Sequence, residues 1–278
     1  MDAKSASTNE CSCESVALYA DDELLYAASP QKHRVLSPDL TSAAAPSCVT
    51  HLNAVVREFT RGQQTRISHP SCTPLQRRFE VIAQTTPCAI AVRFNGRHLT
   101  YGELDEQADE LALHLQAGGL VPGSFCVMGL EPSLAQVRAI LASLKAGAAC
   151  LQFDPALTDR ARAAVLAMFE PSILFTRDGN CAVTPVWRMR AIRCAEEPAE
   201  LPHGWPDEMP VHIGTLAYAF ATVSANGSLC ISMRSHQAVG ACVDTALANP
   251  PALAAYPDPA VLWRPLSIGA PLTIAARP

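Results

Sequence analysis

The sequence contains few charged residues and no excess of basic ones. Charged side chains make up 17% of its 278 residues, and the formal net charge is −5. A broad nucleic-acid-binding face needs clustered lysine and arginine to replace the counterions of the phosphates, so this composition argues against a nucleic-acid partner. The apolar fraction of 49% is enough for a substantial core and excludes wholesale disorder.

Long apolar runs are also missing. A membrane-spanning helix needs about eighteen or more consecutive apolar residues, and no such run occurs, so we expect no membrane partner. The N-terminus is polar and acidic, without the basic and apolar regions of a secretory signal. We therefore expect a cytoplasmic protein whose 11 cysteines are reduced.

Signatures of several other site types are absent. No CxxC motif occurs and the histidines share no metal-ligand spacing, so we expect no metal site and interpret the cysteines mainly as small buried apolar residues. No GxSxG motif occurs either, which leaves a hydrolase nucleophile elbow unsupported. Gly227 is the only glycine in residues 216–236, so neither a Walker A loop nor a dinucleotide-binding fingerprint fits there.

The chain divides into two parts. Residues 1–72 are predicted to be a leader or linker, partly disordered, because their apolar positions follow no sustained period. Within them, residues 37–50 are rich in serine, alanine and proline, as linkers are. Residues 73–278 are predicted to form the folded domain.

The middle of the folded domain alternates between two kinds of segment. Strand-like apolar runs occur at 125–130, 150–153 and 173–176, and helical patterns at 134–144 and 158–169 lie between them. Ser133 stands where it can cap the first of these helices. This alternation predicts an α/β fold, a mostly parallel sheet with flanking helices.

The surrounding segments give weaker signals. Residues 89–94 and 98–100 flank Asn95-Gly96, the pair most typical of a tight hairpin. Residues 215–222 predict one more apolar strand. Residues 177–210 are irregular and rich in proline, and residues 262–275 offer short strands at best.

Three motifs, in this order, resemble the adenylation domains of nonribosomal peptide synthetases. Residues 99–104 (LTYGEL) are similar to that family's LTYxEL motif, and residues 144–155 (LKAGAACLQFDP) to its LKAGxAYVPLDP motif. Residues 216–236 (LAYAFATVSANGSLCISMRSH) are similar to its LAYxxYTSGTTGxPKG motif and the histidine that follows. The resemblance places the chain in the adenylate-forming, or AMP-binding, superfamily. It implies the fold of the first half of an adenylate-forming N-terminal subdomain.

The third motif is the one that the resemblance connects with chemistry. It implies a loop whose backbone N–H groups and hydroxyls surround the ATP phosphates, with Mg²⁺ nearby. Thr222, Ser224, Asn226 and Gly227 would bind ATP there. No catalytic residue and no metal ligand of this chain is assigned.

Parts of that loop are degenerate. Cys230 replaces the family's lysine, and a neutral thiol cannot pair with phosphate as an ammonium group does. Ile231 replaces the last glycine, and a β-branched residue does not readily adopt the positive φ open to glycine. An ordinary strand followed by a polar turn therefore stays an alternative interpretation of this segment.

The resemblance implies an ancestral reaction in which ATP and an amino or aryl acid give an acyl-adenylate and pyrophosphate. The family's later elements, a ribose-binding aspartate, a C-terminal lysine and a phosphopantetheine site, do not occur in this sequence. We expect the chain to be inactive alone. The alternative is a non-catalytic pseudo-domain that binds a partner synthetase, or a decayed gene product.

Half of a subdomain would leave apolar sheet surface that the other half normally covers. Such a surface is either exposed or buried against a partner. We therefore expect a partner synthetase or carrier domain.

Overall fold

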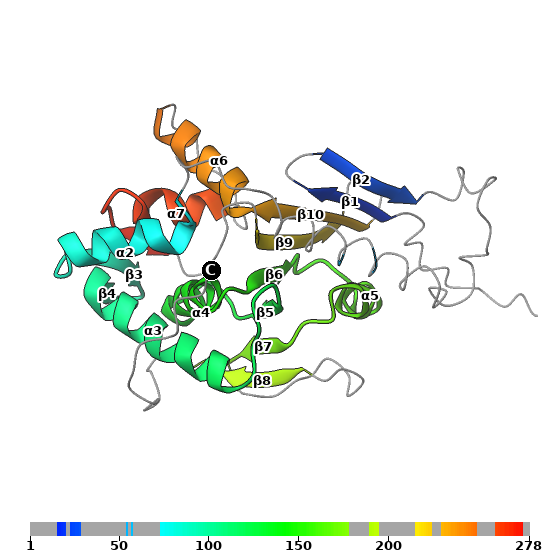
Figure 1. Cartoon of the computed structure of the whole chain (residues 1–278), viewed down its shortest axis with the longest axis horizontal. Helices are drawn as coiled ribbons and strands as arrows, with labels where there is room; N and C mark the ends of the chain where they lie inside the picture. Colours follow the sequence, from blue (N-terminus) through cyan, green and yellow to red (C-terminus); the bar gives the residue numbers. More distant parts are fainter. Residues whose placement is uncertain are drawn as a thin grey trace, which may run out of the picture.

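The computed structural model describes residues 16–20, 23–28, 54, 57, 73–177, 189–194, 215–223, 229–248 and 259–274. They form an α/β fold in which helices cover a large sheet and a smaller sheet lies at one end (Figure 1).

The large sheet is mostly parallel. Its strand order is β2-β1-β10-β9-β6-β5-β7-β8. Neighbours run parallel except in the pairs β1–β2 and β9–β10. The strands are β1 (Val16–Ala20), β2 (Glu23–Ala28), β5 (Phe125–Gly129), β6 (Ala149–Phe153), β7 (Ile173–Thr176), β8 (Arg190–Arg193), β9 (Leu216–Val223) and β10 (Leu229–Ser235). The predicted fold class is confirmed.

Two crossover helices join the central strands as the alternation predicts. Helix α4 (Leu134–Lys145) lies between β5 and β6, and helix α5 (Asp159–Phe169) between β6 and β7. Each begins at a hydroxyl cap that satisfies a free backbone donor of the first turn. The Ser133 side chain accepts the N–H of Gln136, and Thr158 that of Ala161.

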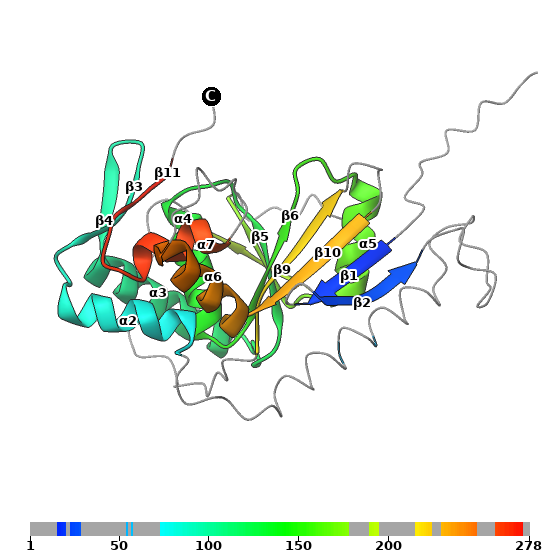
Figure 2. The same cartoon turned by 90° about the horizontal axis from the view of Figure 1, so that it is seen from above.

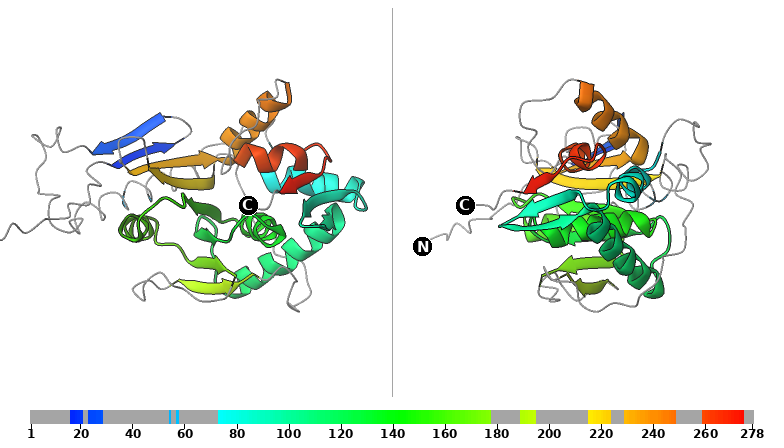
Figure 3. Two further views of the ribbon diagram at one scale, coloured as in Figure 1. Left: turned by 180° about the vertical axis from the view of Figure 1, so that it is seen from behind. Right: turned by 90° about the vertical axis from the view of Figure 1, so that its left-hand side faces the viewer.

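The central strands divide their side chains between two cores, because successive residues of a strand point to opposite faces. In β5, Cys126 and Met128 belong to the core that contains α4, whereas Phe125 and Val127 belong to the core that contains α5. Helices α4 and α5 accordingly lie on opposite sides of β5 and β6 (Figure 3). Both faces of the central sheet are therefore buried.

The small sheet has the order β11-β3-β4 and contains the predicted hairpin. Its strands are β3 (Ile90–Phe94), β4 (Arg97–Thr100) and β11 (Leu272–Ile274). Asn95 and Gly96 both have positive φ, 49° and 75°, as a tight type I′ turn requires.

The end of this hairpin starts helix α3 (Tyr101–Ala117). The Thr100 hydroxyl accepts the N–H of Glu103, and the Glu103 carboxylate accepts the N–H of Thr100 at 2.8 Å. These reciprocal bonds form a capping box and hold the pKa of the Glu103 carboxyl below its usual value. Hairpin and helix are therefore joined by the LTYGEL motif itself.

Three more helices contribute side chains to the same core as α3 (Figure 2). They are α2 (Leu75–Thr85), α6 (His236–Ala248) and α7 (Pro259–Leu266). Arg78 on α2 donates to both carboxylate oxygens of Asp244 on α6, at 2.7 and 3.1 Å.

Helix α7 corrects the prediction for residues 262–275. Short strands at best were expected, but among the described residues of this range only β11 is a strand, and residues 262–266 belong to a helix. Leu262, Trp263 and Leu266 share one face at helical spacing and are at most 7% exposed. Pro259 begins the helix, where the missing N–H of proline does no harm. The helical period was hidden by its short length and by neighbouring prolines.

Two segments that were expected to be irregular also contain strands. Strand β8 lies within residues 177–210 and pairs with β7. Strands β1 and β2 lie within residues 1–72, and β1 pairs with β10. A strand that depends on a distant partner leaves little local signal in a short sequence window. The division at residues 72 and 73 itself stays a prediction.

Exposed apolar surface is sparse in the described ranges. Four large apolar side chains are exposed there, and they come from separate places: Val81, Val121, Val223 and Ile268. No uncovered sheet face appears around β5, β6 and β9 among the residues that the structure describes. Within the same ranges, no helix combines the length and the apolar character needed to cross a bilayer.

Two motif tyrosines hold helix α7 in place. The indole N–H of Trp263 donates to the hydroxyl of Tyr218 at 2.7 Å, and both side chains are buried. The Tyr101 hydroxyl lies 3.3 Å from the carbonyl of Pro265 and 3.1 Å from that of Ala270. Burial raises the pKa of Tyr101 to about 12, so this hydroxyl stays a donor.

We predict that Tyr218→Phe destabilises the protein by about 1–3 kcal/mol, because it leaves the buried Trp263 N–H without this acceptor. The measurement is the free energy of unfolding in urea. The double variant Tyr218→Phe/Trp263→Phe is the control. If the bond matters, the two single losses add up to more than the loss in the double variant.

Candidate functional site

The third motif forms the hairpin of β9 and β10. The last residue of β9, Val223, pairs with the first residue of β10, Leu229. Residues 224–228 join the two strands. Ser224, Asn226 and Gly227, three of the four residues predicted to bind ATP, lie outside the described residues.

Thr222 is the described member of that set. It pairs with Cys230 across the two strands, so both side chains lie on the same face of the sheet. The Thr222 hydroxyl donates to the Cys230 carbonyl at 3.4 Å. Both residues are half-buried. A lysine at position 230 would therefore stand next to a threonine hydroxyl at the start of the loop.

The hairpin lies at the edge of the sheet where parallel strands end. Strand β9 runs parallel to β6, so their carboxyl ends meet at one edge. There the N–H of Asp154, directly after β6, donates to the carbonyl of Ala221 at 2.9 Å. Ligands of open α/β sheets bind outside the carboxyl ends of the strands. Thr222 and Cys230 thus lie at the edge at which a ligand is expected.

The two degenerate positions differ in their surroundings. Cys230 is half-buried, whereas Ile231 is fully buried in the α5 core. Ile231 also pairs with Ala221 inside the ladder, so its backbone is extended. Position 231 is a core position of β10 in this chain, and a glycine there would leave a cavity.

His236 ends the motif and is fully buried. Its Nδ1 accepts the backbone N–H of Leu75 at 3.4 Å, a free donor in the first turn of α2. Desolvation lowers the pKa of His236 to about 3, so the ring is neutral. A neutral ring can accept this bond, and a cation there would oppose the positive end of the α2 dipole. His236 therefore joins the end of β10 to α2.

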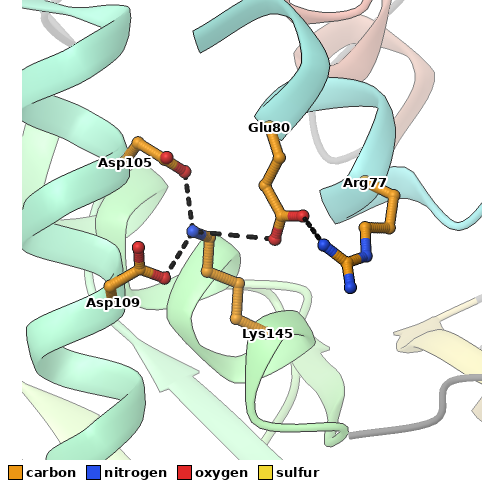
Figure 4. A network of polar contacts seen from close by, with 5 residues as sticks. All are labelled: Arg77, Glu80, Asp105, Asp109 and Lys145. Atoms are coloured by element: carbon orange, nitrogen blue, oxygen red, sulfur yellow. Dashed lines mark hydrogen bonds and ion pairs between the residues drawn. The ribbon is translucent and has the colours of Figure 1, made fainter. Parts of the chain in front are cut away.

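The LKAGAACLQFDP motif places a lysine inside the protein (Figure 4). The Nζ of Lys145 lies 2.6 Å from Asp105, 2.5 Å from Asp109 and 3.7 Å from Glu80, and the Lys145 side chain is 4% exposed. Arg77 in turn contacts Glu80 at 2.9 Å. We call Arg77, Glu80, Asp105, Asp109 and Lys145 the lysine network; it joins α2, α3 and α4.

The lysine network is held by opposing electrostatic effects. Burial raises the pKa of Asp109 and of Glu80, because water no longer solvates their charged forms, while Lys145 acts in the other direction. The neighbouring carboxylates Asp105 and Asp109 hold the pKa of Lys145 above its ordinary value, although burial alone would lower it. The network thus keeps a cation buried by surrounding it with acceptors.

The lysine network was not predicted from the sequence. Its signal is a lysine in a mostly apolar helix together with acids four residues apart on a second helix, Asp105 and Asp109. The lysine network has a structural role in packing the helices, because its members contact one another and the Lys145 side chain is almost completely buried.

A cavity of about 340 Å³ lies away from these motifs, beside the β3–β4 turn and β11, and none of the described residues of the β9–β10 hairpin lines it. No group of three or more metal-ligating side chains occurs in the described part of the chain.

The sequence matches the model of a family described as AMP-binding enzyme over residues 79–223, more than half of the chain. The chain belongs to this family. The match includes every element from β3 through β9. It therefore contains Thr222 and the whole lysine network except Arg77. The resemblance to adenylation domains of nonribosomal peptide synthetases is confirmed by relatives of that kind.

Two relatives of this AMP-binding domain are bacterial synthetases. Dimodular nonribosomal peptide synthase of Bacillus subtilis (strain 168) is 38% identical over 111 residues, which are 40% of this chain and 4% of that protein. Tyrocidine synthase 2 of Brevibacillus parabrevis is 39% identical over 94 residues, 34% of this chain and 3% of that protein. The chain thus spans less than a tenth of the length of these relatives.

Solved structures share the fold. The N-terminal subdomain of Klebsiella oxytoca NpsA, in complex with 3-hydroxybenzoyl-AMSN, has a TM-score of 0.58 at 22% identity, over 76% of this chain and 57% of that one. FmoA3 in its AMPPNP-bound form has a TM-score of 0.61 at 23% identity, over 78% of this chain and 24% of that one. The AMP-binding domain therefore has the fold of an adenylation N-terminal subdomain, over part of its length.

We predict that Lys145→Met lowers the free energy of unfolding by about 3–5 kcal/mol near neutral pH, because it leaves Asp105 and Asp109 facing each other without their cation. The raised pKa values of Asp109 and Glu80 mean that protonation favours the folded state, an effect that is lost as pH rises through the folded pKa. The drop in unfolding free energy caused by Lys145→Met should therefore be smaller near pH 5 than near neutral pH.

Urea unfolding at two pH values checks this. Arg177→Met is the control, since Arg177 and Glu131 form an ion pair with both side chains more than 70% exposed. Such a pair contributes at most about 1 kcal/mol. Equal losses in the two variants would contradict a structural role of the lysine network.

A second prediction concerns His236. The pKa of His236 in the folded protein is about 3, below the ordinary 6.5. Between these two pH values the unfolded chain binds a proton at His236 and the folded chain does not. This contribution to stability is present above pH 6.5 and is lost as pH falls towards about 3. In His236→Gln, stability should fall less steeply over this window. Parallel curves of unfolding free energy against pH for variant and wild type would contradict the prediction.

Proposed function

We propose that this AMP-binding domain is an adenylation-like part of a nonribosomal peptide synthetase. The ancestral reaction joins an amino or aryl acid to the α-phosphate of ATP and releases pyrophosphate. The proposal includes the division into a leader, residues 1–72, and a partial AMP-binding domain, residues 73–278. It is supported chiefly by the place of the β9–β10 hairpin at the carboxyl edge of the parallel strands.

ATP with Mg²⁺ is the proposed ligand of that edge. Thr222, Ser224, Asn226 and Gly227 would contact the phosphates through hydroxyl, amide and backbone groups. Thr222 lies at the start of the loop, beside position 230. The fit to a triphosphate is incomplete, because Cys230 offers a neutral thiol where the motif has a lysine. We therefore infer weak binding and no acyl-adenylate formation by this chain alone.

The partners follow from the same proposal. The relatives are multi-domain synthetases, and one similar structure is an adenylation domain fused to a carrier domain, NpsA-ThdA. We infer a partner synthetase or carrier domain, and an amino-acid or aryl-acid substrate.

A second function is favoured by one observation. Ile231 has become a core residue of β10, and Cys230 beside it carries no charge to hold phosphate. A chain that had lost ATP binding would keep the fold and act as a non-catalytic pseudo-domain that binds a synthetase, or be a decayed product. Affinity for ATP separates the two proposals.

The test is a titration of the full chain with MgATP, in which calorimetry measures the binding affinity. Cys230→Lys should bind MgATP about tenfold more tightly than wild type, the effect of one charge-assisted contact of about 1.4 kcal/mol. Cys230→Met is the matched control, of similar length and without charge. It should bind no better than wild type.

Thermal stability gives a second measurement, because a ligand that binds the folded state raises the melting temperature with its concentration. If neither wild type nor Cys230→Lys binds at millimolar MgATP, the ATP site is absent and the pseudo-domain interpretation stands. Ile231→Gly is unsuitable for this test, since it removes a fully buried side chain.

A further inference from the structure

The cavity beside the β3–β4 turn is formed by the three strands of the small sheet. Its volume of about 340 Å³ lies near the lower end of the range for small-molecule sites. Arg93, Arg97 and His98 line it, and in the ranges described above no acidic side chain does. The small sheet lies at one end of the molecule, away from β9 and β10 (Figure 2).

Polar side chains of the cavity form one row across the small sheet. Arg93 on β3 lies opposite His98 on β4 and opposite Thr273 on β11, so the three side chains share a face. Ile90 lies on this face too, because the register shifts within β3 and pairs Ile90 with Thr100, two residues after His98. The row therefore has an apolar side chain beside it.

The opposite face of the small sheet packs against the protein. Val92 is fully buried, and Phe94 packs against the same core. Arg93, His98 and Thr273 are exposed. The strands are thus fixed from one side, and the row on the other side is open to a ligand.

The row gathers hydrogen-bond donors around a guanidinium group. Arg93 has no hydrogen bond or ion pair within the described part of the chain. The nearby carboxylate of Glu103 already accepts the N–H and the hydroxyl of Thr100, at 2.8 and 3.0 Å. These bonds chiefly lower the pKa of Glu103, and attraction to His98 adds a smaller effect. An anion from outside would supply the acceptor that Arg93 lacks.

We propose that this row binds the phosphate group of a small phosphate monoester, whose apolar part lies against Ile90. The planar guanidinium of Arg93 can donate to two phosphate oxygens at once. The Thr273 hydroxyl and the His98 ring can donate to the third. A carboxylate has two oxygens, so donors on three neighbouring strands match a phosphate better. The proposal does not depend on ATP binding at the β9–β10 hairpin.

The first experiment is a titration of the full chain with phenyl phosphate, in which calorimetry measures the affinity. Arg93→Gln should bind at least about tenfold more weakly than wild type, because it loses a charge-assisted pair. Arg193→Gln is the matched control, since Arg193 is also an exposed strand residue but lies on β8, outside the cavity. The proposal is overturned if wild type does not bind at millimolar phenyl phosphate, or if Arg93→Gln binds as tightly as Arg193→Gln.

Two further probes test the class of ligand. Inorganic phosphate lacks the apolar group, and benzoate has a carboxylate in place of the phosphate. Each should bind about tenfold more weakly than phenyl phosphate, which combines both features. If inorganic phosphate bound equally well, the site would take free phosphate. If benzoate did, it would take carboxylates, and either result overturns the monoester.

The third experiment locates the bound probe and separates it from the proposed ATP site. Phenyl phosphate should shift the amide NMR signals of Arg93, His98 and Thr273 most strongly. Thr273→Val keeps the shape without the hydroxyl and should bind about threefold more weakly. Cys230→Lys should leave the affinity for phenyl phosphate unchanged. Signal shifts confined to residues 222–230 would place the probe at the β9–β10 hairpin and overturn the proposal.

Discussion

The buried ammonium group of Lys145 is the constraint on which the helical layer depends. Its three acidic neighbours come from two helices, Glu80 from α2 and both aspartates from α3. A charge removed from water is tolerated only where acceptors surround it in good geometry. Each of the three helices must therefore be in place before the lysine is satisfied, so the network selects one arrangement of α2 and α3 over α4.

The motifs that mark the family serve packing as much as chemistry. Thr100 caps α3, while Tyr101 and Tyr218 hold helix α7 through hydrogen bonds. His236 accepts a backbone donor of α2. These contacts do not require a ligand, so a chain can keep the motifs while the residues between β9 and β10 change. Position 230 is half-buried and lies opposite Thr222, away from these contacts between helices and sheet.

The sequence predicted the parts of the fold that leave a local pattern. Asn95-Gly96 predicted the hairpin because its conformation needs those residues, and the strands 125–130, 150–153 and 173–176 are apolar in runs. The pairing of β1 with β10 could not be predicted, because each strand is stabilised by pairing with a segment more than 200 residues away. The lysine network was missed for a similar reason, because Lys145 and Asp109 become neighbours only after α3 packs on α4. Of the predicted ATP-binding residues, Thr222 alone could be placed.

The pairing of β1 with β10 has a consequence for the order of folding. The two strands are more than 200 residues apart, and closing so long a loop is slow compared with forming local contacts. During synthesis β1 is made before its docking strand β10, which follows more than 200 residues later. The alternating core of β5, α4, β6 and α5 can form in the meantime from contacts between neighbours. The large sheet is thus completed only when β1 pairs with β10, after the strands between them in the sequence have been made.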